Sequence, residues 1–268
     1  MKKKLIAAIS LTMAAITLVV CSVFATVAYL TASSGVSNVF TVGNVSITMY
    51  ETKVDSDGVP VTPAAKVDAN SYHLVPNKQY MKDPTIKITS LLEEDEMYLY
   101  VKSSNQIRKA EAGNQPDADA STPKSMRQQM VDNGWVEFVR SGDGVEIIWV
   151  YGTRDPATGV ITPTAVNPTK TQLRGDGSTG EPGEFRLCES FTIHKDANVS
   201  LYGAASVNFT AFAIQTSGLD TVQAAWEVIK QSYPYDCGIV NPVNPYNNST
   251  EKPYDAVPGV DAPKPITN

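Results

Sequence analysis

Apolar and polar residues alternate in several segments of the chain, which is the pattern of strands that bury one face. The clearest example runs from Val45 to Tyr50, and Gly43 interrupts the alternation just before it, which predicts a bulge or kink. Further candidate strands cover residues 85–89, 97–102, 135–140, 145–151, 185–193 and 206–214. The turn Ser141–Gly144 joins two of them and predicts a β-hairpin. Short strands with frequent turns favour a β-sandwich or barrel.

Helical spacing marks two segments. The first begins with Thr122 as a predicted N-cap and Pro123 as the first helical residue. The second extends from about Asp220 to Gln231, with Asp220 or Thr221 as its cap. Its apolar face is formed by Val222, Ala225, Trp226 and Ile229. We expect this face to pack on the core, and without β-α-β alternation a parallel α/β sheet is not expected.

The first residues have the pattern of a secretory signal peptide. Lysines at positions 2–4 precede an uncharged stretch from Leu5 to Leu30. Thr26 and Ala28 stand where a signal peptidase requires small residues, so we expect cleavage between Ala28 and Tyr29 and a signal peptide over 1–28. The alternative is an uncleaved membrane anchor, because an apolar run of this length can span a bilayer. The protein is therefore expected to be secreted or held at the cell surface.

The remaining chain divides into a domain over 29–238 and a tail over 239–268 that is rich in Pro and Asn. Within the domain, residues 103–121 are polar and predict an insertion loop. The formal net charge is −6, and loss of the leader lysines makes the mature chain more acidic. An acidic surface disfavours nucleic acid, since phosphate binding needs clustered Lys and Arg.

Residues that carry chemistry are sparse. Cys188 and Cys237 either form a disulfide or remain two buried thiols, and neither lies in a CxxC pair. His73 and His194 are outside any HExxH motif, and GxSxG and phosphate-binding loops are absent. The acidic run 93–96 has a cation site as one interpretation, but we favour a solvated turn. We therefore predict no catalytic residue, metal or cofactor.

Four stretches of the sequence are informative in their order: Ala28–Val45, the segment YHLVPNKQYMKDPTIKI (72–88), MYLYVK (97–102) and AFAIQTSGLDTVQAAWE (211–227). Together they resemble the TasA/camelysin family of exported Firmicutes proteins, in particular its clostridial members. The resemblance implies an all-β fold, a jelly-roll-like antiparallel β-sandwich with two short helices. It also implies a signal peptide that is cleaved by the dedicated peptidase SipW. The residues 103–121 and the tail depart from the family pattern.

The resemblance further implies a structural subunit of biofilm-matrix fibres, in which a freed N-terminal donor strand adds to the next subunit. The candidate donor residues are Tyr29, Leu30, Val36, Val39, Phe40 and Val42. The segment 29–40 has neither charge nor proline, as addition to an open sheet edge requires. Head-to-tail addition gives filaments, and other matrix proteins are possible partners. The alternative is that the segment 36–50 pairs within its own sheet.

Two other functions remain open. The camelysin name carries a metallopeptidase label, for which the residues supply neither a metal-bound water nor a nucleophile with its base. A monomeric cell-surface protein is the other alternative, binding a ligand through loops such as 103–121. Filaments, chelator-sensitive hydrolysis and a stable monomer are the respective expectations of the three hypotheses.

Overall fold

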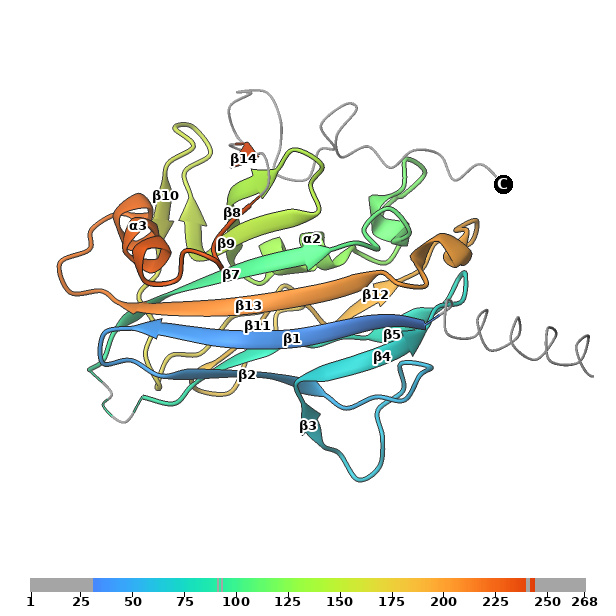
Figure 1. Ribbon diagram of the computed structural model, residues 1–268, viewed down its shortest axis with the longest axis horizontal. Coiled ribbons are helices and arrows are strands. Elements are labelled where there is room, and N and C mark those ends of the chain that lie inside the picture. Colours follow the sequence, from blue (N-terminus) through green and yellow to red (C-terminus); the bar gives the residue numbers. More distant parts are fainter. Residues whose placement is uncertain (1–30, 91, 93, 240–241, 244–268) are drawn as a thin grey trace, which may run out of the picture.

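Strands dominate the part of the chain that the computed structural model describes, residues 31–90, 92, 94–239 and 242–243 (Figure 1). The strands are β1 (Thr31–Val42), β2 (Ile47–Thr52), β3 (Lys66–Val67), β4 (Ala69–His73), β5 (Gln79–Met81), β6 (Thr85–Ile88), β7 (Met97–Asn105), β8 (Trp135–Ser141), β9 (Glu146–Arg154), β10 (Ile161–Pro163), β11 (Glu184–Arg186), β12 (Ser190–Thr192), β13 (Ser206–Gln215) and β14 (Pro242–Val243). The helices of these residues are α2 (Met126–Asp132) and α3 (Val222–Ser232), with the 3-10 turns η1 (Ala112–Asn114) and η2 (Val199–Tyr202).

The strands form a sandwich with one large and two smaller sheets. The large sheet has the order β14-β8-β9-β7-β13-β1-β4, with β10 paired to β9. The second sheet has the order β11-β6-β2-β3, and β12 pairs with β5. The main hydrophobic cluster contains inward-facing residues of both larger sheets, such as Met49, Ile86, Leu99 and Phe209. The predicted all-β sandwich is therefore confirmed.

A second hydrophobic cluster lies on the other face of the large sheet, where α3 covers it (Figure 1). Trp226 of α3 packs edge-on against Phe212 of β13, with ring centroids 5.5 Å apart. Thr221 caps the helix by accepting a hydrogen bond from the Ala224 N–H at 3.1 Å. This confirms the predicted helix, its cap and the burial of its apolar face.

The predicted hairpin is also confirmed, because β8 and β9 pair antiparallel on either side of the Ser141–Gly144 turn. The start of α2 differs from the prediction, however. Its N-cap is Ser125 rather than Thr122, and a reciprocal capping box joins Ser125 to Gln128. Such a box satisfies two helix-terminal donors at once, which favours the later start. Pro123 therefore precedes the helix.

Other expectations also differ from the structure. The segment 185–193 forms two strands rather than one, since β11 pairs with β6 and β12 pairs with β5. Residues 103–121 are not a wholly polar insertion: β7 continues to Asn105, and Ile107, Ala110 and Glu111 are buried. The many small Ala side chains of this segment are the reason that its sequence predicts a loop.

Gly43, which was expected to form a bulge or kink, forms a corner with positive φ just after β1, whereas the register shift within β1 lies between Val36 and Val39. The sandwich also reaches past residue 238, because Pro242–Val243 pairs with β8. The predicted signal peptide and cleavage site, including Ala28, lie outside the described residues, as does nearly all of the tail.

Candidate functional site

The candidate donor segment forms β1, which lies inside the large sheet between β13 and β4 (Figure 1). β1 runs parallel to β13, with Ser33–Val36 opposite Ser206–Phe209 and Val39–Val42 opposite Ala211–Ile214. Its first half also pairs antiparallel with β4, over residues 31–35. The antiparallel sandwich expected from the sequence therefore contains one parallel pair among the described strands.

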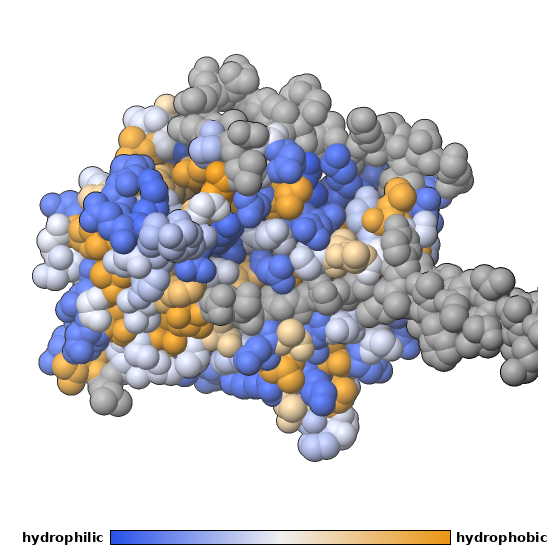
Figure 2. Space-filling model, viewed as in Figure 1, coloured by the Kyte–Doolittle hydropathy of each residue, from blue (hydrophilic) through white to orange (hydrophobic). Residues whose placement is uncertain are grey.

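The second half of β1 is held by the end of α3. Phe40 stacks on Phe212, with centroids 5.4 Å apart, and packs against Tyr233 at 4.5 Å. The Tyr233 hydroxyl donates a hydrogen bond to the Thr41 carbonyl at 2.6 Å. Figure 2 shows an apolar patch beside α3, at this end of β1. Phe40 and Val42 are half-buried and pack against the hydrophobic cluster under α3. Tyr233 thus links the helix to the backbone of the strand.

A tight corner at Gly43 joins β1 to β2 in the other sheet. The backbone of Gly43 has φ +92°, a conformation that is disfavoured for residues with a Cβ atom. A Cβ at this position would lie 2.9 Å from the Cβ of Gln215, closer than such atoms approach. The corner therefore requires glycine, and within the described residues it is the covalent connection of β1 to the rest of the fold.

The predicted donor residues fall into two groups. Tyr29 and Leu30 lie outside the described residues. Val36 pairs in register with Phe209, just before the bulge. Val39 packs toward the sandwich core, whereas Phe40 and Val42 contact the cluster under α3. The described segment is thus paired within its own sheet, which is the alternative that the sequence left open, and pairing between copies stays a prediction.

The two cysteines of the described region are free and buried. Cys188 belongs to the sandwich core, and Cys237 belongs to the cluster under α3 on the opposite face of the large sheet. Burial raises the pKa of both thiols, that of Cys237 to about 11. Of the two alternatives, the structure contains buried thiols, because the sheet lies between them.

The histidines have structural contacts. The Nδ1 atom of half-buried His194 accepts a hydrogen bond from the Asp196 N–H at 3.2 Å. Exposed His73 pairs with Thr31 in the β4–β1 ladder. Among the described residues, no group of three or more His, Cys, Asp or Glu side chains is placed to hold a metal ion. Glu93 of the acidic run lies outside those residues.

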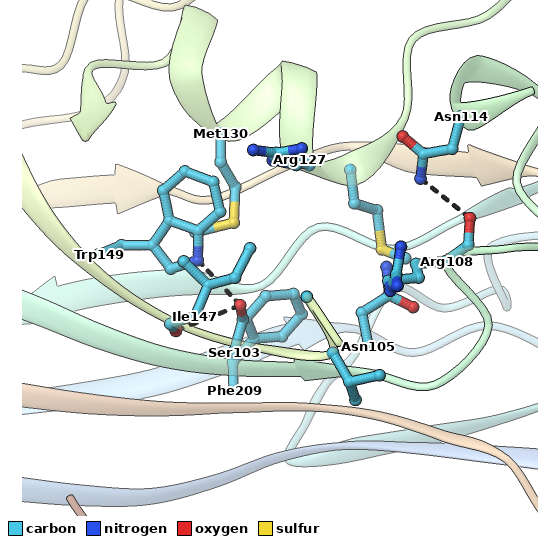
Figure 3. A pocket seen from close by; sticks show the side chains of 12 residues that line it. Ser103, Asn105, Arg108, Asn114, Arg127, Met130, Ile147, Trp149 and Phe209 are labelled. Atoms are coloured by element: carbon cyan, nitrogen blue, oxygen red, sulfur yellow. Dashed lines mark hydrogen bonds between the residues drawn. The ribbon is translucent and has the colours of Figure 1, made fainter. Parts of the chain in front are cut away.

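A small cavity of about 40 Å³ lies between α2 and the strands β7 and β9 (Figure 3). Trp149 lines one side, and its indole N–H donates to the Ser103 hydroxyl at 2.8 Å. Arg127 lines the side toward α2, and Arg108 lies across the cavity from Trp149 (Figure 3). This volume accommodates one or two water molecules, which is too little for a peptide or nucleotide substrate.

A buried carboxylate that sequence reasoning missed lies next to this cavity. Glu111 is fully buried and accepts hydrogen bonds from the Met126 N–H at 2.8 Å and the Asn105 amide at 2.5 Å. Burial raises the pKa of Glu111 to about 7, although these bonds and the charge of Arg108 act in the opposite direction. Glu111 therefore anchors the start of α2 and titrates near neutral pH.

These features define a β-sandwich in which the first described strand is an interior strand of the larger sheet. Comparisons of the chain with models of known families, with curated proteins and with solved structures give no match. Within the described residues, no helix combines the length and apolar character needed to cross a membrane.

Proposed function

We propose that this protein is a secreted structural subunit of extracellular biofilm-matrix fibres, assembled by donation of β1 to the next copy. The observation that carries this proposal is the place of β1 between β13 and β4, combined with its attachment through Gly43. A strand attached at one end can exchange between identical copies while keeping all of its contacts. The resemblance of the sequence to the TasA/camelysin family supports the same function.

Main-chain hydrogen bonding supplies the affinity in this proposal. Without β1, the sheet presents two open edges, along Ser206–Ile214 of β13 and Ala69–His73 of β4. Open edges are templates for strand addition, and β1 of a neighbour restores the same pairs on both sides. Each subunit then donates one strand and accepts another, and this head-to-tail contact extends into a filament.

Processing of the leader controls the donor in this proposal. A SipW-type peptidase cleaves between Ala28 and Tyr29, and the strand that begins there becomes free to move to another subunit. The assembled protein is located outside the cell, where other matrix proteins can join the fibres. No enzymatic step is required of the protein itself.

A trans-disulfide experiment tests the donation. Ser33 of β1 and Ser71 of β4 are directly opposite each other in the register. One batch of secreted protein carries Ser33→Cys and a second batch carries Ser71→Cys, and the two are mixed under assembly conditions and oxidised. Donation between copies predicts a covalent dimer of the two variants, and electron microscopy of the same mixture is expected to show filaments.

The matched control pairs Ser33→Cys with Ser178→Cys, since Ser178 is exposed and lies in a turn whose hydrogen bonds are with Arg174 and Asp176 rather than with β1 or its partner strands. This mixture should give no specific dimer. Deletion of residues 29–40 should abolish filaments. Filaments that form without any Ser33–Ser71 cross-link, or that survive the deletion, would contradict the proposal.

A second candidate function has one specific observation in its favour. Because β1 completes its own sheet, the protein has the contacts of a stable monomer. A monomeric cell-surface protein that binds a ligand through its loops is consistent with this. It predicts that the Ser33→Cys, Ser71→Cys double variant forms its disulfide within one chain and that the mixture of single variants stays monomeric.

A further inference from the structure

A lysine and a glutamate contact each other in the core of the sandwich. Glu51 is the third inward-facing residue of β2, after Ile47 and Met49. Lys82 lies between β5 and β6. The Lys82 Nζ atom is 3.0 Å from Glu51 Oε2, and both side chains have zero exposure to solvent. This buried pair differs from the solvent-exposed ion pairs that most lysines form.

The surrounding contacts fix the chain segments that carry the two residues. The backbone N–H of Lys82 donates to the Glu189 carbonyl at 2.9 Å. The neighbouring Asp83 carboxylate accepts hydrogen bonds from the backbone N–H and the hydroxyl of Thr52, at 2.8 and 2.7 Å. These paired contacts hold the two chain segments in one register. The Lys82 amino group and the Glu51 carboxyl group are therefore held next to each other, which raises the effective concentration of the amine at the carboxyl group.

The environment of the pair is apolar and disfavours charge on Glu51. The Phe209 ring of β13 lies 5.5 Å from the Lys82 amino group. Burial raises the pKa of Glu51, with a smaller contribution from Asp83, while the Lys82 charge lowers it. The Oε1 atom of Glu51 has no hydrogen-bond partner among the described residues. Burying an ion pair with an unsatisfied oxygen costs free energy, which conversion to a neutral group removes.

We propose that Lys82 and Glu51 form an intramolecular isopeptide bond. In the neutral form of the pair, the Nζ lone pair attacks the Glu51 Cδ atom and forms a C–N bond. One carboxyl oxygen leaves as water, and its two protons come from the carboxyl group and the amine. The product is a secondary amide, and no oxidant, reductant or external co-reactant is needed.

The bond would close a covalent loop that contains β3, β4 and β5. β4 is the strand that pairs with the first half of β1, and Phe209 beside Lys82 belongs to the strand on the other side of β1. The cross-link therefore ties the loop that contains β4, a neighbour of β1, covalently to the core. This modification is independent of strand donation, because it requires only the folded sandwich.

Intact mass spectrometry of the secreted, folded protein tests the proposal. After the N-terminus is determined by Edman sequencing, the wild-type mass should be lower than its sequence mass by one water molecule. Peptide mapping should recover the Lys82 and Glu51 peptides as one branched species. A full sequence mass, or a dehydration that maps to other residues, overturns the proposal.

Two controls make the result specific. The double variant Lys82→Met, Glu51→Leu replaces the pair by apolar residues of similar size, so that the core remains filled. Its mass should equal its own sequence mass, and a persistent loss of water would overturn the assignment. The exposed pair Lys78–Asp57 has a shorter N–O distance of 2.5 Å and is accessible to water. Its peptides should remain separate in the wild-type digest.

Discussion

Replacing Glu111 by glutamine should make the stability of the protein less dependent on pH between about 4.5 and 7. Glu111 is fully buried, and its pKa of about 7 in the folded protein exceeds the ordinary glutamate value of 4.5. The folded state therefore binds a proton more tightly than the unfolded state. Stability from this group is fully present below pH 4.5 and is lost as the pH rises to 7.

The magnitude follows from the two pKa values. Their difference corresponds to about 3 kcal/mol of unfolding free energy lost between pH 4.5 and pH 7. Glutamine has nearly the same shape as the protonated side chain and carries no charge at either pH. Its absolute stability will change, because the Asn105 amide and the Met126 N–H both need an acceptor at position 111. The slope with pH is therefore the informative quantity.

Urea unfolding at pH 5 and pH 8, followed by tryptophan fluorescence, measures that slope. The wild type should lose on the order of 3 kcal/mol more than Glu111→Gln between these conditions. The exposed Glu227, which pairs with Lys230, provides the control, and Glu227→Gln should keep the wild-type slope. Equal slopes for wild type and Glu111→Gln would refute the argument that burial controls this carboxyl group.

Three further substitutions test how β1 and α3 are held. Tyr233→Phe removes the hydroxyl bonded to the β1 backbone and should lower the unfolding free energy by about 1 kcal/mol in urea titrations. Gly43→Ala forces a Cβ against Gln215 at positive φ, and should cost about 1–3 kcal/mol in the same assay. Trp226→Ala empties the cluster under α3 and should cost about 3–5 kcal/mol by thermal unfolding, whereas Tyr235→Ala, at a side chain 96% exposed, should be neutral.

The elements that the sequence predicts well are those with local signals. The β8–β9 hairpin has its turn residues between two apolar runs, and α3 has a cap followed by a helical stripe. The helix α2 begins later than predicted, because Thr122-Pro123 and the Ser125–Gln128 capping box are competing local signals for a helix start. Glu111 also favours the later start, because it accepts a hydrogen bond from the first helical N–H, that of Met126, and this contact is not visible in the local pattern.

Features set by distant contacts were not predictable in this way. The residues just before Gly43 alternate, but nothing local predicts the parallel pairing of β1 with β13, which joins residues 33–42 to residues 206–214. The segment 185–193 carries apolar residues among polar ones along its whole length, and its division into β11 and β12 follows from having β6 and β5 as separate partners. Glu51 and Glu111 are ordinary acidic residues by type, and their significance comes from burial that only the folded chain creates.

If β1 is donated as proposed, the balance between monomer and filament follows from the geometry of β1. Its hydrogen bonds to β13 and β4 are the same whether the strand belongs to the same chain or to a neighbour, so these contacts cancel in the comparison. The contacts of Phe40 with Tyr233 cancel in the same way, so what remains is the loss of freedom on association and the change of backbone conformation at the Gly43 corner. Assembly should therefore depend on subunit concentration, and changes that loosen the Tyr233 contact should speed strand exchange more than they alter the final filament.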